Sequence, residues 1–391
     1  MTNSLFSDLV CSECQTVHVA NEVQNFCKNA NCSETLLARY DFQQVRISKE
    51  DLKNRPFTMW RYKEFLPIIH PENIVSLGEG GTPLFKAERL GKTIGLQHLY
   101  WKDEAGNPTG SFKARGMSAA ISKAKELGIK KLAIPTAGNA GVALAAYGAR
   151  AGMETHVYMP RETPDIHKRE VEYYGGTLVE IDGNIGDCGK LIAELAPKFG
   201  WFNVSTLKEP YRLEGKKTMG YELAEQFNWE LPDVILYPTG GGTGLIGFWK
   251  AFDELELLGW IGSKRPRLIA VQSDSCDSIV TAHQNQDLKA VAVDKGFTIA
   301  NGLRVPKSFA DKLILRILKS TNGTSIAISD AEIAEALSEI ARNEGMFVAP
   351  EGAALWAALK KLKSADDVEE SERIVLVNTG SGYKYTDNIF K

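Results

Sequence analysis

Four glycines stand among five residues in the segment Thr239-Gly240-Gly241-Gly242-Thr243-Gly244, between an apolar strand-like run and a helical one. Residues without side chains let backbone N–H groups approach an anion closely, and a helix N-terminus adds partial positive charge. A tight turn without a ligand is the structural alternative, but such a turn needs fewer glycines. The segment therefore predicts a phosphate site.

The same glycines also match part of a dinucleotide-binding fingerprint, Gly242-Thr-Gly244-Leu-Ile-Gly247. That fingerprint expects an acidic residue about 20 residues further on. Asp274, which follows the next strand, lies farther away than that, and the motif sits in the second half of the chain. A nicotinamide oxidoreductase is therefore only an outside alternative.

A second strand-to-helix turn has the sequence Thr136-Ala137-Gly138-Asn139-Ala140-Gly141. Its hydroxyl, its amide side chain and the N–H groups of the helix start suit a carboxylate. A helix N-cap with glycines kept for packing fits the same residues equally well. The spacing leaves both alternatives open.

A lysine ends the segment Asn107-Pro-Thr-Gly-Ser-Phe-Lys113, just before a helical run. A cation at a helix start is disfavoured by the helix dipole. The same field lowers the cost of the neutral amine, which Schiff-base chemistry needs. For a lone lysine, a solvated surface side chain is the simpler interpretation.

Four of the six cysteines lie near the N-terminus as two short-spaced pairs, Cys11/Cys14 and Cys27/Cys32. Each pair can hold one side of a tetrahedral zinc ion, and four thiolates leave no open position for water. The second pair is spaced more widely than usual. The cluster predicts a structural zinc site, and the alternative is four unpaired thiols in a loose N-terminus.

Short apolar runs alternate with amphipathic segments over most of the chain. The pattern predicts strands at 131–135, 155–159, 177–181, 233–237, 267–272 and 373–377, and helices at 117–127, 142–151, 166–174, 245–258, 332–342 and 352–362. Such alternation is typical of parallel sheets covered by helices on both faces. Ligands bind beyond the carboxyl ends of these strands, so the turns at 136–141, 240–244 and 379–382 are the candidate sites.

The composition bounds the class of protein. A chain of 391 residues with 43% hydrophobic and 24% charged residues is a globular protein with more than one domain. A net charge of −3 gives no reason to expect nucleic acid or a membrane surface as a partner. No apolar run could span a membrane and no secretory signal is visible, so we expect the cytoplasm. Motifs of serine hydrolases, zinc proteases and P-loop kinases are absent.

Together, in this order along the chain, the motifs resemble the fold-type-II family of pyridoxal-phosphate enzymes, and within it the threonine synthases. The resemblance runs from Leu77-Gly-Glu-Gly-Gly-Thr-Pro-Leu84 to Asn378-Thr-Gly-Ser-Gly382. It implies two open twisted sheets with flanking helices and the cofactor in the cleft between two domains. The implied division is a zinc-ribbon-like segment at 1–48 and a catalytic region at 49–391, with a smaller mobile domain at roughly 114–213. A homodimer is likewise implied only by resemblance.

The resemblance also implies a role for each motif. Lys113 would carry pyridoxal phosphate as a Schiff base and act as the catalytic base, and Asn139 would contact the ring oxygen. Thr136, Ala137 and Gly138 would lie at the substrate carboxylate, with Gly240, Gly241, Gly242 and Thr243 at the cofactor phosphate. Thr379 would face the pyridine nitrogen, and Arg212 the phosphate of the substrate. The implied reaction converts O-phospho-L-homoserine and water to L-threonine and phosphate.

Three features depart from the threonine synthase pattern. Ala114 follows the lysine where many threonine synthases have aspartate, and the glycine loop looks more like that of serine/threonine dehydratases. The stretch before Arg212 lacks an expected Asn-Ser pair, for which Ser205, Thr206 and Lys208 could substitute. A dehydratase is therefore the main alternative, and a non-catalytic relative that keeps the fold for binding is a third.

Overall fold

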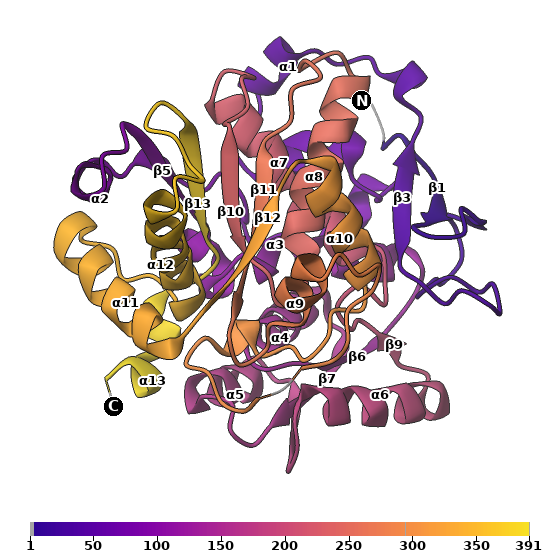
Figure 1. Ribbon diagram of the computed structural model, residues 1–391. Helices are drawn as coiled ribbons and strands as arrows, with labels where there is room; N and C mark the ends of the chain where they lie inside the picture. Colours follow the sequence, from indigo (N-terminus) through magenta and orange to yellow (C-terminus); the bar gives the residue numbers. More distant parts are fainter. Residues whose placement is uncertain (1–3, 294, 391) are drawn as a thin grey trace.

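The computed structural model describes residues 4–293 and 295–390 as an α/β molecule built on three sheets (Figure 1). The largest sheet has six strands in the order β12-β11-β10-β13-β5-β4, all parallel except the edge strand β4. Its strands are β4 (Leu84–Lys86), β5 (His98–Asp103), β10 (Val234–Pro238), β11 (Arg267–Ser273), β12 (Thr324–Ile328) and β13 (Arg373–Asn378).

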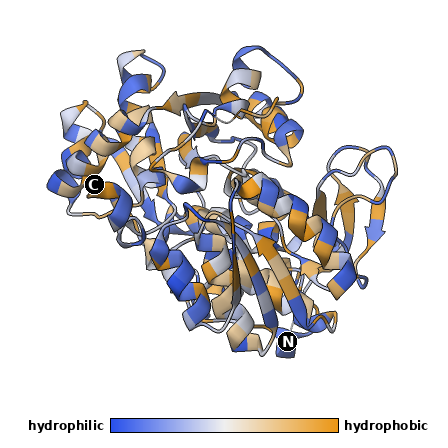
Figure 2. Ribbon diagram, turned by 90° about the horizontal axis from the view of Figure 1, so that it is seen from below, coloured by the Kyte–Doolittle hydropathy of each residue, from blue (hydrophilic) through white to orange (hydrophobic). Residues whose placement is uncertain are grey.

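Strand β10 explains why this sheet is covered on both faces. Val234 and Leu236 belong to one apolar cluster, while Ile235 and Tyr237 belong to another on the opposite face. Successive side chains of a strand alternate between faces, so a run of apolar residues needs helices on both sides. Figure 2 shows the result, with helices that change from hydrophobic to hydrophilic around their circumference.

The helices of the large sheet form two layers. The first cluster continues into α2 (Glu88–Thr93), α11 (Asp330–Glu344) and α12 (Pro350–Ser364). The second continues into α7 (Tyr211–Gln226), α8 (Thr243–Leu257), α9 (Ser278–Gln284) and α10 (Asp311–Ser320). Short helices α1 (Lys49–Lys53) and α13 (Thr386–Ile389) lie near the two ends of the chain. Within the described residues, no helix is long and apolar enough to cross a membrane.

The smaller sheet lies at the bottom of Figure 1 and has four parallel strands in the order β8-β7-β6-β9. Its strands are β6 (Lys131–Pro135), β7 (Glu154–Pro160), β8 (Thr177–Ile181) and β9 (Phe202–Asn203). The helices around it are α3 (Lys113–Glu126), α4 (Asn139–Ala151), α5 (Asp165–Tyr173) and α6 (Ile185–Phe199). The two parallel sheets confirm the expected fold class.

The N-terminal segment forms a third, antiparallel sheet in the order β2-β1-β3. Its strands are β1 (Phe6–Cys11), β2 (Val17–Val19) and β3 (Leu36–Tyr40). The segment is not loose: Leu9 and Leu36 are buried in the same apolar cluster as Met117 of α3. The Tyr40 hydroxyl donates a hydrogen bond of 2.7 Å to the buried Glu214 of α7.

Helices α3 and α7 pack closely against each other, and this contact positions the site described below. A Cβ atom on Gly215 would lie 2.0 Å from the backbone oxygen of Arg115. Next to it, the buried Arg115 guanidinium pairs with Glu104 and Glu222 at 2.6 Å each. Lys102 of β5 donates to the same Glu222 at 3.0 Å, so each buried charge in this network has an opposite partner.

Each strand and helix expected from the sequence is present, with ends shifted by a few residues. Several elements were not predicted, above all the inner strand β5, the helices α6, α7 and α10, and the strands β9 and β12.

Replacing Gly215 with alanine tests the α3–α7 contact. The added methyl group would meet backbone rather than a movable side chain, so we expect the free energy of unfolding to fall by about 1–3 kcal/mol or more. Gly189→Ala is the matched control, because a Cβ there would meet only Pro135 Cγ at 3.9 Å. Urea unfolding of both variants is the measurement, and a Gly215→Ala protein as stable as the control would contradict the packing.

Candidate active site

The three turns expected to carry chemistry converge on one cleft between the two parallel sheets. Residues Thr136–Asn139 reach it from the small sheet, and Gly240–Thr243 and Thr379 from the large one. Lys113 lies on the same cleft wall. The structure therefore brings together every predicted residue of the candidate active site except Arg212, which does not line the cleft directly.

The loop before Lys113 is hydrogen-bonded to the residues that follow β13. Thr109 and Gly110 both adopt left-handed backbone conformations, with φ of 62° and 68°. The Phe112 N–H donates to the Thr379 carbonyl at 3.0 Å, and the Ser381 N–H donates to the Gly110 carbonyl at 3.0 Å. Helix α3 thus begins at a fixed point, and Lys113 is its first residue.

The Lys113 amine points into the cleft rather than into solvent. It is half-buried, and its Nζ lies 3.9 Å from the centroid of the Phe112 ring. Burial, together with the nearby Arg212 cation, lowers the pKa of Lys113 to about 7, and the Glu351 carboxylate opposes the shift. A substantial fraction of the amine is therefore neutral near neutral pH, and the surface-lysine alternative is wrong.

The glycine loop between β10 and α8 is an open backbone cradle. Gly242 has a φ of 80°, a conformation that favours glycine, and no side chain caps the start of α8 within the described residues. A Cβ on Gly240 would lie 2.3 Å from the Gly302 oxygen, and one on Gly241 would lie 2.7 Å from Thr206 Cγ2. Side chains at these positions would clash with neighbouring atoms, which accounts for the glycines. The backbone N–H groups at the start of α8 suit an anion.

The turn between β6 and α4 ends with Asn139 as the first helical residue. Gly138 has a φ of 138°, and its N–H donates to Thr136 Oγ1 at 3.1 Å. The Asn139 amide donates to the Tyr385 hydroxyl at 2.9 Å, while its Oδ1 is buried with no partner in the described structure. No side chain caps α4 in the described structure, and Asn139 lines the cleft.

Two further residues of the cleft, Tyr385 and Glu351, were not predicted. The Tyr385 hydroxyl donates to Glu351 Oε1 at 3.0 Å, and the Gly302 N–H donates to the same oxygen at 2.6 Å. Burial raises the pKa of Glu351, and its Oε2 has no partner among the described residues. A glutamate within the apolar run 348–359 was the available sequence signal.

Arg212 lies behind the cleft wall, at the start of α7. Its side chain is buried, and its Nη1 donates to the Val204 carbonyl at 2.6 Å and to Thr206 Oγ1 at 3.3 Å. Thr206 does line the cleft. The Nε and Nη2 of Arg212 have no hydrogen-bond partner in the described part of the chain, and Glu209 approaches Nε only to 3.9 Å.

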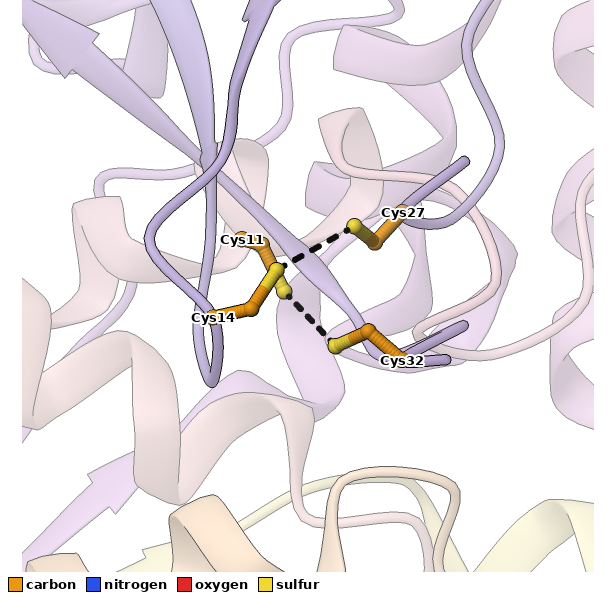
Figure 3. A group of neighbouring side chains, drawn as sticks. All are labelled: Cys11, Cys14, Cys27 and Cys32. Carbon is orange, nitrogen blue, oxygen red and sulfur yellow. Dashed lines mark hydrogen bonds between the residues drawn. The ribbon is translucent and has the colours of Figure 1, made fainter. Parts of the chain in front are cut away.

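The four N-terminal cysteines form a compact sulfur cluster (Figure 3). Cys11 Sγ lies 3.4 Å from Cys32 Sγ, and Cys14 Sγ lies 3.6 Å from Cys27 Sγ. All four sulfur atoms lie within 4.8 Å of one another. Four thiolates around one zinc ion stand about 3.8 Å apart, given a Zn–S distance of about 2.3 Å, so the cluster has the size of a tetrahedral site.

Comparison with known proteins agrees with this geometry. Residues 75–380 match the model of the pyridoxal-phosphate dependent enzyme family. The chain is 34% identical to threonine synthase of Methanocaldococcus jannaschii over 96% of its own length and 93% of that protein. It is also 34% identical to threonine synthase of Methanosarcina acetivorans, over 95% of this chain and 91% of the relative.

Solved structures support the fold alone. Maize serine racemase superimposes with a TM-score of 0.66 at 24% identity, covering 77% of this chain and 88% of the racemase. The family match spans the cleft residues from Lys113 to Thr379. The chain belongs to the pyridoxal-phosphate dependent enzyme family and, within it, to the threonine synthases.

Proposed function

We propose that this protein uses pyridoxal phosphate to convert O-phospho-L-homoserine and water to L-threonine and phosphate. The observation that carries the proposal is the cleft itself: a half-buried lysine amine faces a glycine cradle, and a buried arginine with open donors lies behind the wall. Relatives named threonine synthase that align over nearly the whole chain support the same reaction.

The residues of the cleft fit the cofactor. The Lys113 amine, with its pKa lowered to about 7, is the group that would hold the cofactor's aldehyde carbon. The cradle at Gly240–Thr243 would receive the phosphate, and Asn139 and Thr379 would face the ring. Asn139 Oδ1 is buried and has no hydrogen-bond partner in the described structure, as expected of a side chain that binds a ligand.

The cofactor, when bound, supplies an electron sink for a carbanion at the substrate's Cα. Lys113, once released by the incoming amino group, accepts and returns the Cα proton from its place at the start of α3. Thr136, Ala137 and Gly138 would lie at the substrate carboxylate, to which the Thr136 hydroxyl and the Ala137 N–H would donate. The Thr136 N–H already donates to the Tyr158 carbonyl, and the Gly138 N–H to Thr136 Oγ1. The near-neutral pKa of Lys113 suits an amine that both takes up and gives back protons.

Arg212 is the proposed contact for the substrate phosphate. Its Nη1 is held by Val204 and Thr206, which leaves Nε and Nη2 as open donors. Two guanidinium N–H groups can bind a phosphate in a bidentate arrangement. Motion of the smaller domain, roughly residues 114–213, would close the cleft around the substrate.

We further propose that the four cysteines hold a structural zinc ion. The cluster lies outside the cleft, where strand β1 and the turn after residue 26 meet. With four thiolate ligands the ion has no open position for catalysis. A homodimer is proposed from the family resemblance alone.

A single assay tests the reaction. Offered O-phospho-L-homoserine and threonine in separate tubes, the protein should release phosphate and threonine from the first. Lys113→Ala should lose the visible absorbance of the bound cofactor and lower kcat by roughly 10³-fold or more, because it removes the general base. Oxobutanoate from threonine, with no phosphate from O-phospho-L-homoserine, would mean a dehydratase instead.

The protonation of Lys113 is a second test, made on cofactor-free protein. Labelling with an amine-directed reagent at a series of pH values should give a midpoint near the pKa of about 7. Arg212→Gln removes a cation that lowers this pKa, so the midpoint should rise. The peptide with the exposed Lys190 serves as reference in the same digest. A midpoint that stays or falls in Arg212→Gln would contradict the arrangement.

Metal analysis tests the zinc site. The purified protein should contain about one zinc ion per chain, and the double variant Cys11→Ser/Cys14→Ser should contain none. Cys188→Ser is the control, because Cys188 is buried in a different cluster. Should the double variant not fold, modification of the thiols in the unaltered protein should release the zinc. Zinc content that persists in the double variant, or unaltered protein free of zinc, would refute the site.

A further inference from the structure

One buried cation of the cleft has no assigned role. Lys216 lies in α7, one turn after Arg212, and its side chain is fully buried. Its Nζ donates a single hydrogen bond, of 2.8 Å, to Thr243 Oγ1 at the start of α8. Among the described residues it forms no ion pair, although both Lys216 and Thr243 line the cleft.

The neighbouring Lys217 shows what a structural lysine looks like in this helix. It is equally buried, but its Nζ lies 2.6 Å from Glu214 and 2.8 Å from Glu254. Burying a lone ammonium is expensive, and proteins normally pair such a group. Lys217 obeys that rule and Lys216 does not, although the two residues are adjacent.

The surroundings of Lys216 make its charge harder to bury. Burial lowers the pKa of Lys216 well below its ordinary value, and the Arg212 and Lys113 cations lower it further. The start of α8 adds a partial positive charge, because the N-terminus of a helix points its N–H groups outward. Two lysines and a helix N-terminus in one cleft, with the Arg212 cation behind its wall, are complementary to a multiply charged anion.

The side chain of Lys216 packs against a glycine of the neighbouring helix. A Cβ on Gly116 of α3 would lie 2.9 Å from Lys216 Cε. Helix α3 therefore leaves room for this side chain and restricts where it points. Packing of the side chain, and not an ion pair, directs the ammonium group toward the glycine cradle.

We propose that Lys216 is the counter-ion of the cofactor's phosphate, which it binds together with Thr243 and the N–H groups at the start of α8. The proposal rests on the proposed use of pyridoxal phosphate. Its bond to Thr243 places the ammonium at the cradle, whereas Arg212 is anchored behind the wall through its Nη1, which donates to Val204 and Thr206. The two cations thus serve two phosphates, one of the cofactor and one of the substrate.

Titration of the cofactor-free protein with pyridoxal phosphate and with pyridoxal, which has no phosphate, tests this assignment. Lys216→Met and Lys216→Gln should bind pyridoxal phosphate on the order of 10- to 100-fold more weakly, the range expected for loss of a charge-assisted hydrogen bond. Binding of pyridoxal should be unchanged. Equal weakening for both ligands, or no weakening for either, would overturn the proposal.

Thermal unfolding of the same cofactor-free proteins separates this role from a structural one. Lys216→Met removes an unpaired buried charge, so its Tm should equal or exceed that of the unaltered protein. Lys217→Met is the contrast, since it leaves two buried carboxylates with one lysine fewer and should lower Tm. A fall in Tm for Lys216→Met as large as that for Lys217→Met would identify Lys216 as structural and overturn the proposal.

Two other outcomes distinguish the possible failures. If Lys216→Met binds pyridoxal phosphate normally but shows a raised KM for O-phospho-L-homoserine, Lys216 serves the substrate and only this inference fails. If the unaltered protein binds neither pyridoxal phosphate nor pyridoxal, the proposed function fails as well.

Discussion

The close contact between helices α3 and α7 determines the chemistry of the cleft. Lys113 is the first residue of α3, and Arg212 and Lys216 lie in the first turns of α7. The absence of a side chain at Gly215 lets the two backbones touch, and the buried ion pairs of Arg115 hold the same helices together. Any shift between these helices would therefore move the lysine relative to the two other cations.

The buried lysines and arginines of the interior have carboxylate partners, whereas the side chains of those at the cleft have none within hydrogen-bond distance among the described residues. Arg115 and Lys102 face Glu104 and Glu222, and Lys217 and Lys250 likewise face Glu214 and Glu254. At the cleft, the described structure shows no carboxylate hydrogen-bonded to the side chains of Lys113, Lys216 and Arg212. Glu209 approaches Arg212 Nε only to 3.9 Å, and Glu351 accepts from Gly302 and Tyr385 instead. An anionic ligand is the natural complement, because buried charges are stable only when paired.

The sequence predicted what depends on local pattern and missed what depends on distant partners. The turns at the carboxyl ends of strands were found because glycine spacing and strand order are visible along the chain. Strand β5 was missed because Lys102 breaks its apolar run, and its partner Glu222 lies in α7. Helix α7 was missed because it is buried over nearly its whole length and mixes charged residues such as Lys217 and Glu222 with apolar ones, so its sequence shows no amphipathic period. Lys216 and Glu351 could not be singled out, since an unpaired charge is recognisable only once its neighbours are known.

Ala114 raised the alternative of a dehydratase, and its surroundings weaken that argument. The residue is fully buried in an apolar cluster with Met117 and Val204, so its identity follows from packing. The cleft's charge is the better guide to the substrate. Serine and threonine carry no phosphate, and would leave the open N–H groups of Arg212 buried without a partner, at about 1–3 kcal/mol for each lost hydrogen bond. In the proposed reaction a phosphorylated amino acid would satisfy those donors, and the same phosphate would then be the leaving group.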